Sequence, residues 1–418
     1  MNLIGRDYIN YLCAQIAIFG VPIILLPLLT RSLSTTDYGL IGLFNSFTQS
    51  VSLIGSISLA GAVARAYLDR EGGIEFPLYL GNSIIVNLVL TSFATCLFGF
   101  SFGIIYETSF PTIFIALALV LVISTCVKEI LLSLWNVMGF SKGYAFLVIS
   151  VAILNVVSCG ILLSIWSDWT ARIFPLVLFE ALCAIFSLVY LNKKFGVILR
   201  KEVSYLFDLL KFGVPLIPHS LGLLFITAAD KFIVSMIFGL EELGVYSVAS
   251  AGVALVSLVL LPLDKALTPT IYDRLYAGTL TAKIFLGWSV SYFAITNAVA
   301  FLVFIALSIA IPIIVGPMFQ AAIDMVGVLV IGQIWFAMYR FWVKVIFFTK
   351  KTWQVSISTC VGGMLGCLVQ YYGGLESGIG FFLWGVVFGF FGSACLVAVF
   401  AFKSLVCDES ISSDCGNV

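Results

Sequence analysis

The apolar segments of this chain restrict most strongly how it can fold. Crossing the hydrocarbon layer of a membrane takes about 17–25 residues of helix, and twelve segments reach that length. In lipid the backbone must satisfy its own hydrogen bonds, so runs of this length predict helices. We therefore predict an all-α polytopic membrane protein. Its twelve transmembrane helices are expected at 8–30, 40–62, 80–103, 112–134, 144–165, 173–191, 211–238, 243–263, 284–309, 324–347, 353–372 and 380–402.

The composition agrees with this class and excludes several others. Hydrophobic residues make up 61% of the chain and charged residues only 10%, against about 25% charged in soluble domains. The formal net charge is zero, so charge indicates no nucleic-acid partner. One histidine and ten cysteines without a C-x-x-C pair predict no metal site, no cofactor and no disulfide framework. No G-x-x-x-x-G-K-[ST] occurs, so the chain itself is not expected to hydrolyse ATP.

The basic residues between the segments predict the orientation in the membrane. The connections on one side contain only Arg31 and Arg172. Cytoplasmic loops carry an excess of Lys and Arg, which places both termini in the cytoplasm. The basic residues of that side are Arg6, Arg65, Arg70, Lys142, Lys193, Lys194, Arg200, Lys201, Arg274, Lys283, Lys350, Lys351 and Lys403.

The longest cytoplasmic connection divides the chain into two sets of six spans. We predict a six-helix bundle at 1–191, a linker at 192–210, a second bundle at 211–403 and a cytoplasmic tail at 404–418. Residues 33–47 and 239–253 are weakly similar, each with a short acidic turn before a glycine. Six spans is an even number, so the repeats share an orientation, and we expect the bundles to be related by a pseudo-twofold axis.

A stripe of polar side chains runs along the second span. At 100° per residue, Asn45, Gln49, Ser52 and Ser56 lie within about 60° of one another. Amides facing lipid would be left without partners, so the stripe faces either another helix or a water-filled cavity, and four aligned polar residues favour the cavity. A shift of 205 residues maps the stripe onto a less polar set in span 8 that includes Ser250 and Ser257.

The seventh span carries charges that are expensive in hydrocarbon. Asp230 and Lys231 are adjacent, and the only histidine, His219, lies eleven residues earlier. With Pro215 and Pro218 before His219, we expect an unbroken helix that places His219 and Asp230 on one face. The charges form either a local ion pair or part of a cavity wall. Glu180, near the middle of span 6, has no evident partner in the sequence.

Three stretches resemble polysaccharide repeat-unit flippases. They are "LLTRSLSTTDYGLIGLFNSF" (28–47), residues 209–255 with Pro215, Pro218, Asp230, Lys231 and the G-x-Y of Gly244 and Tyr246, and "TPTIYDRLY" (268–276). The chain thus resembles the O-antigen and capsule flippases of the multidrug/oligosaccharidyl-lipid/polysaccharide exporter superfamily.

The resemblance implies transport of undecaprenyl-diphosphate-linked oligosaccharide across the bacterial inner membrane, as in lipopolysaccharide assembly, without enzymatic activity. It implies a substrate cavity lined by spans 1, 2, 7 and 8, and as partners a polysaccharide polymerase and a chain-length regulator. Arg31 and Lys231 would attract the diphosphate, while His219, Asp230 or Glu180 would couple an ion. Few cavity arginines are present, unlike in related peptidoglycan-precursor flippases.

Two other functions compete with this interpretation. One is an ion-coupled multidrug or metabolite exporter, which would share the twelve spans. The other is a membrane enzyme such as a polysaccharide polymerase or acyltransferase. Such enzymes commonly carry catalytic residues on a long outward loop, and the short outward connections of this chain argue against one.

Overall fold

The structure, a computed structural model, describes residues 2–70, 73–105 and 112–414, all of them in helices or their connections. It confirms the all-helical prediction and the twelve spans, because twelve segments of the described residues are long and apolar enough to cross a membrane. The side of the membrane on which the termini lie stays a prediction.

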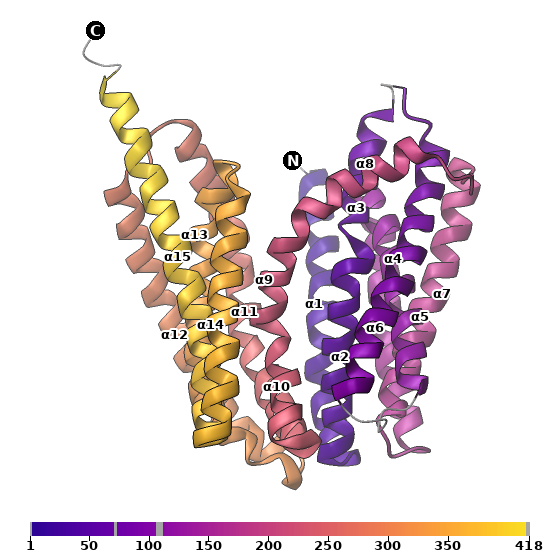
Figure 1. Ribbon diagram of the computed structural model, residues 1–418, viewed down its shortest axis with the longest axis vertical. Helices are drawn as coiled ribbons and strands as arrows, with labels where there is room; N and C mark the ends of the chain where they lie inside the picture. The colour runs from indigo at the N-terminus through magenta and orange to yellow at the C-terminus, as the bar shows by residue number, and fades with distance from the viewer. Residues whose placement is uncertain (1, 71–72, 106–111, 415–418) are drawn as a thin grey trace. The chain divides into compact units, whose positions relative to one another are not determined.

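The chain divides into two compact units, Met1–Ile217 and Pro218–Val418, which we call the N-terminal half and the C-terminal half (Figure 1). The predicted division into bundles, linker and tail remains a prediction. The first unit contains α1 (Asn2–Ser32), α2 (Thr35–Ser56), α3 (Leu59–Leu68), α4 (Phe76–Ile105), α5 (Thr112–Val137), α6 (Ser141–Leu163), α7 (Thr170–Phe195), α8 (Val203–Gly213) and the 3-10 turn η2 (Val214–Leu216). From the boundary onward follow α9 (Ile217–Thr227), α10 (Ala229–Ile237), α11 (Gly239–Tyr276), α12 (Ala282–Ile314), η3 (Pro317–Phe319), α13 (Ala322–Phe348), α14 (Thr352–Ser377) and α15 (Ile379–Asp414).

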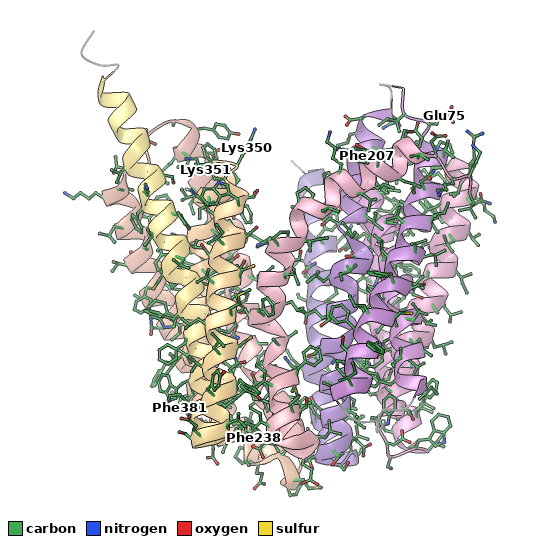
Figure 2. All side chains as sticks on the ribbon, viewed as in Figure 1. Glu75, Phe207, Phe238, Lys350, Lys351 and Phe381 are labelled. Carbon is green, nitrogen blue, oxygen red and sulfur yellow. The ribbon has the colours of Figure 1, made fainter. Side chains whose placement is uncertain are left out.

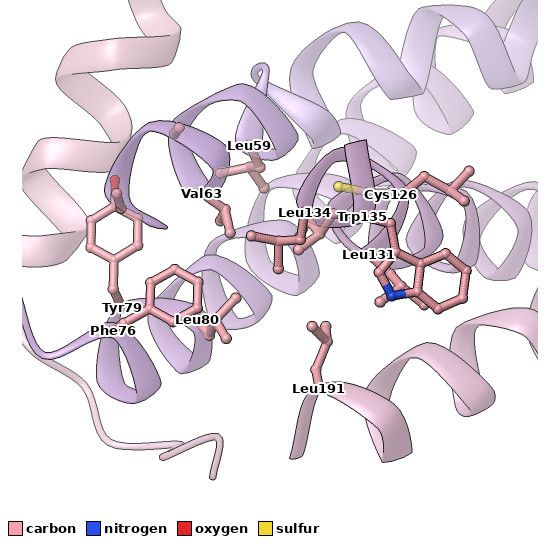
Figure 3. Close-up of a cluster of buried hydrophobic side chains, with 14 of the residues drawn as sticks. Leu59, Val63, Phe76, Tyr79, Leu80, Cys126, Leu131, Leu134, Trp135 and Leu191 are labelled. Carbon is pink, nitrogen blue, oxygen red and sulfur yellow. The ribbon is translucent and has the colours of Figure 1, made fainter. Parts of the chain in front are cut away.

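In the N-terminal half, α1 packs against α6, α5 packs against α7, and α2 contacts both α4 and α5. Its core at the α8 end is aromatic and aliphatic, and Figure 3 shows Trp135 and Leu131 of α5 next to Leu191 of α7. The Trp135 ring meets the edge of Tyr190 at a centroid distance of 5.3 Å. These contacts hold α5 and α7 side by side, which matters for the site below.

In the C-terminal half, α15 packs against both α13 and α14. Glycines allow close approaches between these helices: a Cβ on Gly366 would lie 2.8 Å from the Cα of Gly389. Small residues at helix contacts are typical of membrane bundles, where backbones must approach closely. Figure 2 shows Lys350 and Lys351 at one end of this half, with Phe238 and Phe381 at the other.

Two predicted helices are broken. The second span is interrupted at Ile57 and Ser58, whose φ angles of +33° and +52° are left-handed. Neither residue favours that conformation. A tertiary contact accompanies it, because the linker helix α8 ends at Gly213 directly against Ile57, where a Cβ would lie 1.8 Å from Ile57 Cγ2.

The seventh span is broken at Ala228, between α9 and α10. The prediction of an unbroken helix from His219 to Asp230 is therefore wrong. The break places Asp230 in the first turn of α10, where its carboxylate accepts a hydrogen bond from the Lys231 amide at 2.8 Å. Negative charge at a helix N-terminus is favourable, so Asp230 stabilises the new helix start.

Candidate functional site

An open pocket of about 270 Å³ lies in the N-terminal half, between α2, α5 and α7. Three residues of the polar stripe of the second span, Asn45, Gln49 and Ser52, line this pocket. Glu180 of α7 lines it from another helix. The remaining lining residues are Thr48, Leu121, Val122, Thr125 and Leu176. The stripe thus borders a pocket, and its assignment to the wall of a water-filled cavity stays a prediction. Ser56 is half-buried and is not among the lining residues.

Glu180 is held in the pocket by Lys128 of α5. The Lys128 Nζ donates to Glu180 Oε1 at 2.8 Å, so the acid that lacked an evident partner in the sequence is one member of an ion pair. The other carboxylate oxygen, Oε2, is buried and has no hydrogen-bond partner among the described residues. A buried oxygen without a partner costs free energy, and here it belongs to a residue that lines a cavity.

The pocket combines hydrogen-bonding groups with an apolar wall. Its polar groups are amides, hydroxyls and one carboxylate, and its apolar part comes from leucine and valine. Such a surface suits a ligand with many hydroxyl groups and exposed C–H faces, because amides and hydroxyls can both donate and accept.

Asp230 and Lys231 contact each other and groups of neighbouring residues. Lys231 Nζ lies 3.5 Å from Asp230 Oδ1 and 3.4 Å from the Thr227 carbonyl oxygen. The Tyr246 hydroxyl of α11 donates to Asp230 Oδ2. Tyr246 is the tyrosine of the G-x-Y motif, so this motif and the aspartate meet through a hydrogen bond. The contacts agree with the local-ion-pair interpretation of the sequence.

His219 lies on α9, its ring edge-on to Phe347 at 6.2 Å between centroids. Its Nδ1 is buried and makes no hydrogen bond within the described part of the chain. Arg31 lies in the last turn of α1 and is exposed. Ser250 is half-buried and donates to the Ser247 carbonyl of its own helix at 3.1 Å.

A second polar cluster, absent from the predicted sites except for Ser257, joins α11, α12 and α13. Asp264 accepts from the Tyr292 hydroxyl at 2.8 Å, from Arg340 Nε at 3.1 Å and from Lys344 Nζ at 3.0 Å. Arg340 Nη1 also donates to the Ser257 hydroxyl at 2.9 Å, and that hydroxyl donates to Gln333 Oε1 at 2.8 Å. We call these six residues the Asp264 cluster.

A sequence signal for the Asp264 cluster existed. Arg340 and Lys344 are spaced i, i+4 on one helix, which puts two cations on one face of a span. Their acid is separated from them by more than seventy residues and by one intervening helix, so the pairing itself could not be read from spacing. Thr48 and Thr125 were missed because hydroxyls are common in membrane helices, where they bond to their own backbone.

The chain is similar to membrane proteins of Haemophilus influenzae. One, an uncharacterized membrane protein, is 24% identical over 373 residues, covering 87% of this chain and 89% of the relative. The other, "Lsg locus putative protein 1", is 22% identical over 314 residues, covering 72% and 74%.

The fold is similar to that of MATE transporters. A multidrug resistance MATE family transporter of the MOP superfamily, solved in an inward-facing conformation, matches with a TM-score of 0.62 at 13% identity, covering 97% of this chain and 99% of that one. A MATE structure in the straight conformation matches with a TM-score of 0.56 at 14% identity, covering 98% and 96%. At these identities the likeness concerns the fold.

Residues 4–273 match the family described as polysaccharide biosynthesis protein. The match covers more than half of the chain and includes both the pocket of the N-terminal half and the Asp230–Tyr246 contact. The chain is a multi-pass membrane protein that belongs to the polysaccharide biosynthesis protein family.

Proposed function

We propose that the protein is a flippase that moves undecaprenyl-diphosphate-linked oligosaccharide across the bacterial inner membrane. The cargo is the repeat unit of an O-antigen or related surface polysaccharide. In this proposal a polysaccharide polymerase and a chain-length regulator act on the repeat unit after the flippase has moved it. The proposal rests on one observation above the others: amides, hydroxyls and a carboxylate line an open pocket in an apolar helix bundle. Family membership supports a polysaccharide-related cargo.

The physical problem for such a cargo is its head group. A diphosphate and several sugars cannot enter hydrocarbon without large desolvation costs. In the proposed mechanism, alternating access exposes a polar path to one leaflet and then to the other, while the polyprenyl tail stays in lipid. Asn45, Gln49 and Ser52 would exchange hydrogen bonds with sugar hydroxyls in place of water.

Ion coupling belongs to the same proposal. The candidates are His219, Asp230 and Glu180, each a titratable group within the helices. Ionisable side chains within membrane helices are typical of proton and ion relays in transporters. This part is tested by comparing transport with and without a proton or sodium gradient in proteoliposomes.

The test uses a deletion strain in which the leaflet occupied by the lipid-linked repeat unit is scored together with surface polysaccharide. Complementation with Asn45→Leu, checked for membrane abundance, should leave repeat units on the cytoplasmic leaflet. Thr95→Val is the matched control, since Thr95 has a buried hydroxyl in the same half but lines a different pocket. Repeat units that reach the outer leaflet in the deletion strain would refute the proposal.

The fold similarity to multidrug transporters favours one alternative, an ion-coupled drug or metabolite exporter. In that case the deletion strain would become sensitive to drugs, whereas its lipid-linked repeat units would keep their normal sidedness. Both phenotypes are scored in the same strain, so the experiment separates the two functions.

A further inference from the structure

The Asp264 cluster has an unequal balance of charge. Arg340 and Lys344 share one acid, Asp264, in the ion pairs of the described residues. One carboxylate therefore faces two cations, and the cluster carries an excess of one positive charge. Excess charge inside a helix bundle is costly unless an anion compensates it.

The Arg340 guanidinium also has hydrogen-bonding capacity to spare. Its Nε and Nη1 are occupied by Asp264 and Ser257, but Nη2 is buried and has no partner among the described residues. The side chain itself is 19% exposed, whereas the Lys344 side chain is 9% exposed. The cluster is thus more exposed at Arg340 than at Lys344, although the unsatisfied Nη2 itself is buried.

Neutral neighbouring side chains orient the Arg340 guanidinium and do not neutralise its charge. Its carbon lies 4.9 Å from the centre of the Phe336 ring, a stacking arrangement that orients arginine. Gln333 and Ser257 add neutral polar groups beside it. A planar donor fork with a second cation behind it matches the geometry of phosphate oxygens better than that of a single-point anion.

The position along the helices suits a group entering from one membrane face. Arg340 and Lys344 precede the end of α13 by eight and four residues, about 12 and 6 Å along the axis. That end leads to Lys350 and Lys351, which the charge distribution predicts to be cytoplasmic. An anion entering from the cytoplasmic leaflet would meet Arg340 within the first third of the span.

We propose that Arg340, backed by Lys344 and held by Asp264, is a binding site for the phosphate groups of a lipid-linked diphosphate. The assignment of this diphosphate to the carrier lipid rests on the proposed function. It replaces Lys231 as the main cation for the diphosphate, because Lys231 Nζ contacts Asp230 and a backbone carbonyl.

The first experiment measures binding of inorganic diphosphate to the purified full-length protein in neutral detergent by calorimetry. Arg340→Gln should weaken binding at least about tenfold, the loss expected for charge-assisted hydrogen bonds to one group, and it leaves Asp264 paired with Lys344. Arg274→Gln is the matched control: Arg274 lies on α11 in the same half, is exposed, and stacks on Trp288. Its removal should leave diphosphate binding unchanged.

A second pair of variants separates the fork from the charge. Arg340→Lys keeps the charge but loses the planar donors, so it should bind less tightly than the wild type. The double variant Asp264→Asn with Lys344→Met keeps the net charge of the cluster but removes the second cation and the acid that holds Arg340, so it should also bind less tightly than the wild type. Equal binding by wild type and Arg340→Gln, with both proteins folded, would overturn the site.

The source of the phosphate is tested in nanodiscs. Undecaprenyl diphosphate should displace inorganic diphosphate from the wild type at lower concentration than phosphatidylglycerol does, and Arg340→Gln should abolish this preference. If phosphatidylglycerol displaces the probe equally well, the assignment to the carrier lipid is wrong. Failure of the proposed function is recognised separately, because the sidedness of repeat units in the deletion strain does not depend on any binding measurement.

Discussion

At the scale of single residues, the Lys128–Glu180 ion pair offers the sharpest test of how charge is tolerated in the N-terminal half. The side chains are 15% and 10% exposed, so each relies on the other for compensation. Lys128→Met should destabilise the protein by about 3–5 kcal/mol, because it leaves a buried acid without its cation. Thermal unfolding in detergent measures this change.

The control is the double variant Lys128→Met with Glu180→Gln, which removes both charges. It should recover most of the lost stability, since replacing a whole buried pair is often close to neutral. A double variant as unstable as Lys128→Met alone would contradict the pairing.

The Lys128–Glu180 pair also shows how much of an ion pair can be predicted from the sequence. Both charges were visible as unusual in apolar segments, but Lys128 stands next to Glu129 and its partner lies 52 residues away. Which acid it contacts depends on the rotation and neighbours of α5 and α7, and the hydrophobic pattern leaves both undetermined. The Asn45–Ser52 stripe was easier to interpret, because its residues share one helix and helical spacing alone aligns them.

At the scale of elements, the break between α2 and α3 should carry backbone strain. Ser58 has a φ of +52°, a region that costs most residues about 1–2 kcal/mol and costs glycine little. Ser58→Gly should therefore keep or raise stability, by up to about 1 kcal/mol after the greater entropy of glycine in the unfolded chain is counted. Thermal unfolding in detergent checks the sign.

Ala60→Gly, two residues later in the helical part of α3, is the comparison. It should destabilise by up to about 1 kcal/mol, because Ala60 has no left-handed φ for glycine to relieve, and glycine loses more entropy on folding. If Ser58→Gly destabilises as much as Ala60→Gly does, the left-handed conformation is not strained.

The helices were predicted well where the length of an apolar run determines their extent. They were predicted poorly where packing against another helix interrupts them. The twelve spans follow from runs of apolar residues that lipid requires. The breaks at Ile57–Ser58 and at Ala228 contain neither proline nor glycine, and at Ile57 the packing partner is Gly213 of the distant linker helix. No local sequence pattern predicts such a contact.

At the scale of the whole molecule, the number of spans and the charge distribution together predict the orientation. Each crossing reverses direction, so an even number of spans puts both termini on one side, and the excess of Lys and Arg selects the cytoplasm. Figure 2 places Lys350 and Lys351 at the end of the C-terminal half opposite to Phe381. Glu376 is exposed in the last turn of α14, close to Phe381 in the chain, while Lys351 is exposed just before α14 begins.

These two positions give the decisive measurement, in a background where the ten native cysteines are replaced. A membrane-impermeant maleimide added to intact spheroplasts should label Glu376→Cys and leave Lys351→Cys unlabelled until the membrane is permeabilised. The opposite labelling pattern would show that the orientation is inverted. It would then place the Asp264 cluster near the outer leaflet, where Arg340 would meet the diphosphate at release from the protein and not at entry.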